Sequence, residues 1–118
     1  MLFRSEKTKS TEIIVKLTDF GFACEIDPEV GSTLSLGSPT YTAPEVINAS
    51  SSTGNKYDAR CDVWSLGVMV FMILTNTPPF AGRGKREIYA AAQNREPDYG
   101  LLRKYREQGT LEIGRAHV

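Results

Sequence analysis

The chain has few cysteines, no net charge and no long apolar run, and each of these absences excludes a class of protein or of partner. Cys24 and Cys61 are the only cysteines among 118 residues. With no signal peptide ahead of them, we interpret them as reduced thiols of an intracellular, cytoplasmic protein. Two cysteines alone do not make a metal site. The 14 basic and 14 acidic residues cancel, so charge favours neither nucleic acid nor an anionic membrane as a partner.

The longest apolar run extends from Val63 to Leu74. A membrane-spanning helix needs about 20 apolar residues, so no membrane span is expected. The run instead predicts a helix buried on all sides within a protein. Asp62 is expected to cap its first turn, and Pro78 and Pro79 are expected to end it.

The rest of the chain alternates short elements with irregular segments. The prediction is a strand at Ile13–Leu17, an irregular loop at 25–39, a short helix at 44–49, an exposed linker at 50–55 and a helix at 85–94. No assignment is made beyond Gly100. The apolar fraction of 41% is ordinary for a globular chain, and the length allows one domain at most.

The first chemical motif is Asp19-Phe20-Gly21, which directly follows the predicted strand. Magnesium prefers oxygen ligands, typically one or two carboxylates with phosphate oxygens and water. A carboxylate held at the end of a strand, beside a glycine that lets the backbone turn, suits such a site. Taken alone, the tripeptide also fits an ordinary acidic turn.

Two further motifs follow in order. Residues 37–45 read Gly-Ser-Pro-Thr-Tyr-Thr-Ala-Pro-Glu, and residues 62–68 read Asp-Val-Trp-Ser-Leu-Gly-Val. With Asp-Phe-Gly ahead of them and Pro78-Pro79-Phe80 after them, the chain resembles eukaryotic protein kinases over about residues 1 to 100. The Gly-Ser-Pro-x-Tyr-x-Ala-Pro-Glu form is similar to serine/threonine kinases rather than tyrosine kinases.

The resemblance implies roles for the residues that match the motifs. Asp19 is the implied metal ligand, holding Mg²⁺ on the phosphates of ATP, with Phe20 and Gly21 completing the cofactor-binding turn. Ser38 is the implied second catalytic residue, a hydroxyl that contacts the catalytic aspartate and helps to seat the substrate. Most relatives carry threonine there, and serine keeps the hydroxyl.

Three more residues have implied structural roles. Glu45 resembles the acidic residue that pairs with a buried arginine late in the lobe, and this chain offers no candidate for that arginine. Asp62 resembles the helix-capping aspartate that holds the backbone of the catalytic loop. Trp64 resembles a residue that packs behind the activation segment.

The implied fold class is α+β. It is a partial protein kinase-like fold, with the strand before Asp-Phe-Gly, the activation segment and the upper, mainly α-helical C-lobe in residues 1–111. The glycine-rich loop, the catalytic lysine and the His-Arg-Asp loop are missing, and Met1-Leu2-Phe3 resembles the strand that follows that loop. We therefore expect the parent protein to transfer the ATP γ-phosphate to Ser/Thr of protein substrates and the isolated chain to be inactive. The alternatives are a non-catalytic pseudokinase or truncated interaction fragment, and an unrelated helical binding domain with chance motifs.

The subgroup is most similar to calcium/calmodulin-dependent and calcium-dependent kinases, which implies regulation through regions that the chain lacks. No EF-hand loop is present in the sequence. Ser32, Thr33 and Ser35 are candidate phosphorylation sites, since added charge can order such a loop. Relatives controlled in this way often carry threonine where this chain has Leu34, so plain loop hydroxyls are the open alternative.

The last seven residues, 112–118, read Glu-Ile-Gly-Arg-Ala-His-Val and match nothing expected of a kinase at that point. A coding sequence for them is similar to a common sequencing-library adapter. We expect a non-native, adapter-derived tail, and a short native tail is the alternative. In either case His117 is not a candidate catalytic base.

Overall fold

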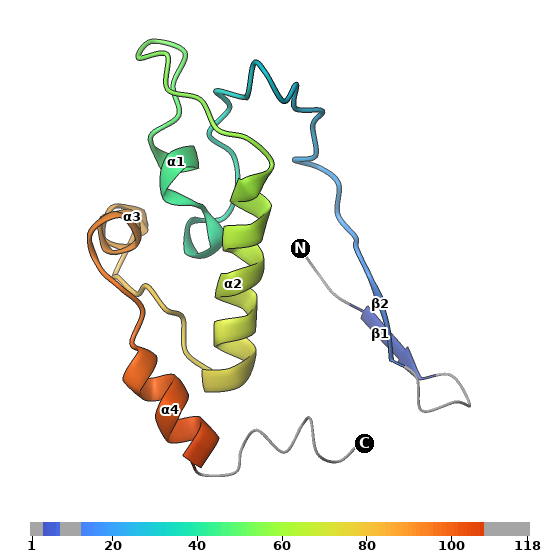
Figure 1. Cartoon of the computed structure of the whole chain (residues 1–118), viewed down its shortest axis with the longest axis vertical. Coiled ribbons are helices and arrows are strands. Elements are labelled where there is room, and N and C mark those ends of the chain that lie inside the picture. Colours follow the sequence, from blue (N-terminus) through green and yellow to red (C-terminus); the bar gives the residue numbers. More distant parts are fainter. Residues whose placement is uncertain (1–3, 8–12, 108–118) are drawn as a thin grey trace.

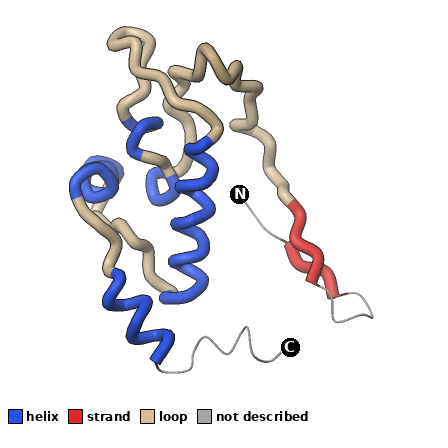
Figure 2. Tube along the Cα trace, in the orientation of Figure 1, coloured by secondary structure: helices blue, strands red, loops and turns tan. Residues whose placement is uncertain are grey.

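The computed structural model describes residues 4–7 and 13–107, and helices make up most of its regular structure (Figures 1 and 2). The elements in chain order are β1 (Arg4–Lys7), β2 (Ile13–Lys16), the 3₁₀ turn η1 (Pro39–Tyr41), α1 (Pro44–Ile47), α2 (Arg60–Thr75), α3 (Lys85–Asn94) and α4 (Tyr99–Glu107). The expected strand at residues 1–3 and the expected tail at 112–118, with His117, lie outside the described residues.

Strands β1 and β2 form an antiparallel hairpin with Arg4 opposite Lys16 and Lys7 opposite Ile13. The predicted strand is confirmed as β2, which ends one residue earlier than expected. Its partner was not predicted, because the segment Arg-Ser-Glu-Lys of β1 has no apolar residue to give a strand pattern. The hairpin stands apart from the helices (Figure 1).

Helix α2 is the central element, and η1 and α4 both contact it. It begins at Arg60, so Asp62 is its third residue and the prediction that Asp62 caps the helix is wrong. A carboxylate ahead of the helix reaches its first turn instead: Asp58 Oδ1 accepts the Arg60 N–H at 2.9 Å. At the other end Asn76 adopts the left-handed conformation and donates its N–H to the Met72 carbonyl at 2.8 Å. Asn76 therefore ends the helix before Pro78 is reached.

The buried residues lie on the side of α2 that carries Val68, Phe71 and Thr75, and on the elements packed beside it. Phe80, Ala91 and Ala92 form a buried cluster, against which Ile47 and Trp64 pack. The rings of Trp64 and Phe80 stack with their centroids 5.4 Å apart. This packing fixes α3 and the Pro-Pro-Phe segment on one side of α2.

The other face of α2 is exposed, which overturns the expectation of a helix buried on all sides. Val63, Leu66, Val70 and Ile73 are 68%, 53%, 47% and 69% exposed. Their spacing of three and four residues places them in one stripe along the helix. None of the elements in the described part of the chain covers this stripe, which we call the α2 stripe.

The smaller predictions for the middle of the chain are confirmed in kind, with bounds that differ by one or two residues. The predicted loop holds no helix or strand up to residue 38, and η1 begins at its last residue, Pro39. Helix α1 begins at Pro44 as predicted and ends at Ile47, two residues early. Residues 51–55 of the predicted linker are exposed while Ser50 is half-buried, and α3 spans the predicted residues. Helix α4 was not predicted, because Gly100 and a run of charged residues hid its short apolar face. Leu101 and Leu102 on that face are half-buried.

Candidate functional site

Asp19 lies in the turn that follows β2, and its backbone is the most unusual in this segment. Its φ is 63°, in the left-handed region that non-glycine residues seldom adopt and that aspartate tolerates better than most. The Gly21 N–H donates to Asp19 Oδ1 at 3.4 Å, and the Ala23 N–H donates to the Phe20 carbonyl at 3.0 Å. These bonds hold a tight turn that leaves the Asp19 carboxylate exposed.

The donor set at this turn fits part of a magnesium site. Asp19 offers an exposed carboxylate with one long hydrogen bond at Oδ1, and no hydrogen bond to its Oδ2 occurs among the described residues, so that oxygen is available to a cation. Among the described residues no group of three His, Cys, Asp or Glu side chains could hold a metal ion. Asp19 therefore fits one ligand of an ion whose other oxygens come from phosphate, water or other protein groups. Phe20 is 69% exposed, and within the described residues its ring lies on no core.

The segment after this turn is held by its own hydrogen bonds. Asp27 closes a turn, accepting the Glu29 and Val30 N–H groups at Oδ1 (2.8 and 3.2 Å) and the Gly31 N–H at its carbonyl (2.8 Å). Ser32 then pairs with Tyr57 through two backbone hydrogen bonds of 2.8 and 2.9 Å. The loop predicted from composition is thus irregular but anchored.

Ser38 opens the η1 turn with its hydroxyl at the surface. Its carbonyl accepts two bonds, from the Tyr41 N–H at 3.0 Å and from the Thr42 hydroxyl at 2.8 Å. Thr42 is buried, and the Ser65 hydroxyl donates to the Tyr41 carbonyl at 2.8 Å. The backbone of the turn is therefore fixed to α2 through Ser65. The Ser38 side chain is exposed and has no hydrogen bond within the described residues. No hydrogen bond between described atoms joins Ser38 to Asp19.

The three residues with implied structural roles occupy different environments. Glu45 lies in the first turn of α1, exposed, and no ion pair to it occurs among the described residues. Asp62 is exposed on α2, where the Cys61 thiol lies 4.0 Å from its Oδ1. Trp64 packs on Phe80, and its indole N–H is buried with no acceptor in the part of the chain that the structure describes.

The three hydroxyls considered for phosphorylation differ in what they contact. Ser32 Oγ accepts the Leu34 N–H at 3.3 Å, and Thr33 Oγ1 shares a hydrogen bond of 3.0 Å with Ser51 Oγ. Ser35 is exposed and its hydroxyl has no partner within the described residues. Ser35 is therefore the most accessible of the three.

Charged groups cluster where the linker enters α2, and sequence reasoning missed two of them, Asp58 and Arg60. Asp58 and Arg60 pair at 2.8 Å. The hydrogen bonds from Arg60 lower the pKa of Asp58, and the same pair raises the pKa of Arg60. Burial raises the pKa of the Cys61 thiol, and the negative charges of Asp62, Glu45 and Asp58 add to this effect.

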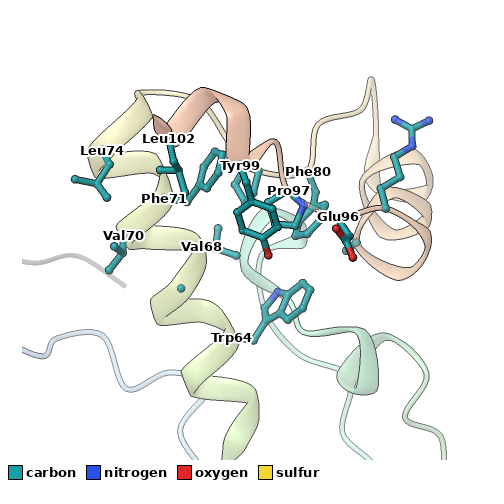
Figure 3. A pocket seen from close by; sticks show the side chains of 14 residues that line it. Trp64, Val68, Val70, Phe71, Leu74, Phe80, Glu96, Pro97, Tyr99 and Leu102 are labelled. Carbon is teal, nitrogen blue, oxygen red and sulfur yellow. The ribbon is translucent and has the colours of Figure 1, made fainter. Parts of the chain in front are cut away.

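A cavity of about 540 Å³ lies away from Asp19, between α2 and α4. Trp64, Phe71, Phe80 and Tyr99 are among the side chains that line it (Figure 3). Its lining is mostly apolar, with Arg95 and Glu96 as its only charged residues. Glu96 is the one carboxylate in this lining and Asp19 is not part of it, so the Asp19 turn and this cavity are separate places on the chain.

The family comparison decides the family of the chain. A family model described as the protein kinase domain matches residues 1–110. The chain belongs to the protein kinase family. The unrelated helical binding domain is therefore excluded, and Asp19, Ser38 and Glu45 lie in a segment of a kinase domain.

Curated relatives of this kinase segment include serine/threonine-protein kinases with different names. It is 38% identical over 82 residues to serine/threonine-protein kinase ATG1a of Arabidopsis thaliana, covering 70% of this chain and 12% of that protein. It is 42% identical over 80 residues to MAP kinase-activated protein kinase 2 of Oryctolagus cuniculus, covering 68% and 20%. It is 41% identical over 83 residues to calcium-dependent protein kinase 3 of Plasmodium yoelii yoelii, covering 68% and 14%.

These matches span between 12% and 20% of the relatives' own lengths. They establish a fragment of a serine/threonine kinase domain, while the finer grouping with calcium/calmodulin-dependent kinases is supported only in part. In the described part of this kinase segment, every helix is too short or too polar to cross a bilayer.

Proposed function

We propose that the protein carrying this chain is an ATP-dependent serine/threonine kinase in which Asp19 is a magnesium ligand. In the reaction, the substrate hydroxyl oxygen bonds to the γ-phosphorus of ATP while the bond to the β–γ bridging oxygen breaks, and ADP leaves. The hydroxyl proton passes to a general base that is not among the motifs of this chain. When bound, Mg²⁺ neutralises charge on the phosphate oxygens during this transfer.

The observation that carries the proposal is the Asp19 turn. A left-handed aspartate costs conformational energy, and such strain tends to persist at functional sites. Here it directs a carboxylate into solvent directly after a strand, and the Gly21 N–H supports one of its oxygens. The membership of residues 1–110 in the kinase family adds support that is independent of this geometry.

Ser38 is proposed to seat the substrate. Its hydroxyl is exposed, while the backbone around it is held by Thr42 and Ser65. A rigid backbone below a free hydroxyl is the arrangement that a positioning role needs, because a hydroxyl on a mobile turn would contribute little to orientation. We assign residues 19–45 as the activation segment on the same grounds.

The α2 stripe supports the further proposal that this chain is one part of a larger catalytic lobe. Four large apolar side chains in a row on one helix are unusual on the surface of a self-contained domain. A lobe that extends beyond this chain would cover the stripe and supply the nucleotide-binding groups that the chain lacks. The isolated chain is then expected to be inactive.

Regulation is the finest part of the proposal. Calcium-linked control, intracellular location and phosphorylation of the loop at Ser35 are each consistent with the relatives or with the exposed Ser35 hydroxyl. Activity of the full-length protein measured with and without calcium and calmodulin tests the first. Mass spectrometry of the loop tests the third.

The test of the function is Asp19→Asn in the full-length protein, assayed with a library of Ser/Thr peptides, ATP and magnesium. Because Asp19 would hold the Mg²⁺ that neutralises charge on the phosphate oxygens, we expect its loss to lower kcat roughly 10²–10³-fold. Glu25→Gln is the matched control, because Glu25 is exposed and has no hydrogen bond within the described residues. Activity of Asp19→Asn within about twofold of wild type would overturn the assignment. Nucleotide binding by the wild type without phosphotransfer would identify a pseudokinase.

A further inference from the structure

The loop ahead of Ser38 is attached at two points to one residue, Tyr57, in the linker before α2. The first attachment is the backbone bridge, in which the Ser32 N–H donates to the Tyr57 carbonyl at 2.8 Å and the Tyr57 N–H donates to the Ser32 carbonyl at 2.9 Å. The second is a hydrogen bond from the Tyr57 hydroxyl to the Leu34 carbonyl. One side chain and its own backbone thus hold residues 32 and 34.

Gly31 makes the close approach of the two strands of chain possible. Its φ is 72°, and a Cβ there would lie 2.9 Å from the Tyr57 carbonyl oxygen and 3.2 Å from Lys56 Cβ. A residue with a side chain would be strained in backbone conformation and would collide with the partner backbone. The bridge between Ser32 and Tyr57 therefore depends on a glycine at position 31.

The Tyr57 hydroxyl binds the loop at a point where the loop side chains are not buried. Leu34 and Leu36 are 55% and 45% exposed, so neither anchors the chain by packing. The Leu34 backbone is held through its carbonyl instead.

The far end of the same loop is held by one hydrogen bond from the second turn of α2 and by one within the loop itself. The Ser65 hydroxyl donates to the Tyr41 carbonyl, and the Thr42 hydroxyl donates to the Ser38 carbonyl, both at 2.8 Å. Residues 34 and 41 are thereby both held, and Ser38 lies between them. The attachment at Tyr57 thus limits where the Ser38 hydroxyl can lie.

We propose that Tyr57 is a positioning residue whose hydroxyl holds the activation loop at the entry of α2 and so places Ser38 for substrate binding. This role rests on the proposed kinase function, whereas the attachment of the loop by this hydroxyl, which we call the latch, does not. The Tyr57→Phe variant removes only the hydroxyl and keeps the ring and the backbone bridge.

The first arm of the test measures the latch alone, by limited chymotryptic cleavage after Leu34 and Leu36 in the full-length protein. Cleavage of a locally opened loop follows the population of the open state. Loss of one hydrogen bond predicts cleavage about fivefold faster in Tyr57→Phe. Tyr99→Phe is the matched control, because the Tyr99 hydroxyl has no partner within the described residues, and its cleavage should equal that of wild type. Equal rates for Tyr57→Phe and wild type overturn the latch.

The second arm measures positioning, as steady-state kinetics of the same variants. Tyr57→Phe is expected to raise KM for the peptide about fivefold and to leave KM for ATP unchanged. Faster cleavage with an unchanged peptide KM overturns the positioning role and leaves a structural latch. A wild-type protein that shows the protected loop but transfers no phosphate contradicts the proposed kinase function and not the latch, so the two failures are distinguishable.

Discussion

The Ser65 hydroxyl, in the second turn of α2, donates a hydrogen bond of 2.8 Å to the carbonyl of Tyr41, 24 residues earlier. The same hydroxyl lies 3.2 Å from the Cys61 carbonyl of its own helix. Tyr41 closes the η1 turn that Ser38 begins. A side chain that sequence reasoning counted only as part of a helix motif therefore fixes the turn that carries a candidate catalytic hydroxyl.

Ser65→Ala should loosen this turn without unfolding α2. The Tyr41 carbonyl loses its donor, and the cost is about 1 kcal/mol in the free energy of unfolding. We expect a few-fold rise in peptide KM in the full-length protein, together with that loss in a urea titration. Glu25→Gln is the control, because Glu25 is exposed and has no hydrogen bond within the described residues. A variant as stable as wild type, with an unchanged KM, would contradict the role given to Ser65.

Gly31→Ala should be more damaging than Gly54→Ala, although the two glycines share nearly the same backbone. Their φ values are 72° and 71°, so alanine meets the same conformational strain at both. Only at Gly31 would the new Cβ meet other atoms within 4 Å, the nearest being the Tyr57 carbonyl oxygen. We expect Gly54→Ala to cost about 1 kcal/mol and Gly31→Ala to cost more and to expose the loop to chymotrypsin. Similar losses in the two variants would mean that the Ser32–Tyr57 bridge contributes little.

Ile73→Asp should have different effects in the isolated chain and in the full-length protein. In the described chain Ile73 is 69% exposed, so a charge there should cost within about 0.5 kcal/mol and reduce self-association in sedimentation measurements. In a lobe that covers the α2 stripe, the same carboxylate would be buried without a partner. It should then lower the free energy of unfolding by about 3 kcal/mol or more. Ile73→Val keeps the stripe apolar and should change little in either protein. A neutral effect in both would argue against a larger lobe over this face.

Cys61 should react more slowly with iodoacetamide than Cys24. Burial and the carboxylates of Asp62, Glu45 and Asp58 raise the pKa of the Cys61 thiol, so less of the reactive thiolate is present at pH 8. Because the folded pKa is raised, folding favours the protonated thiol. The contribution to stability is present below the unfolded pKa and is lost as pH rises through the folded value.

The measurement is peptide mass spectrometry after timed alkylation across a series of pH values. Cys24, which is free and exposed, serves as the internal control. We expect Cys24 to be alkylated roughly threefold or more faster than Cys61 at pH 8, and this difference in rate to become smaller above pH 9. A ratio near one at pH 8 would show that Cys61 is not shielded in solution.

Local chemistry made several elements predictable. The β-branched run of β2, the proline that begins α1 and the amphipathic spacing of α3 act over a few residues, and each gave the right element. The end of α2 was misjudged because Asn76, in a left-handed conformation, terminates the helix before the proline pair. The start was misjudged because the cap was assigned to the motif aspartate rather than to the linker that precedes it.

The residues of the candidate site also fall into two groups, those that local motifs revealed and those that only the structure revealed. Asp19, Ser38 and Glu45 were found because their chemistry is written in contiguous motifs, and their roles remain proposals. Tyr57, Asp58 and Ser65 were not found, because side-chain type alone does not say which backbone carbonyl or charge will lie beside them. Their side-chain partners are Leu34, Arg60 and Tyr41.

The sequence by itself determined the family, the order of the motifs and the position of the turn that carries Asp19, since these depend on residue types and short spacings. The tertiary structure alone decided which side of α2 is buried and which is the exposed α2 stripe. It also decided that the loop ahead of Ser38 is held by Tyr57. Such pairings depend on contacts between residues more than 20 positions apart along the chain, and no local pattern encodes which distant backbone a side chain will meet.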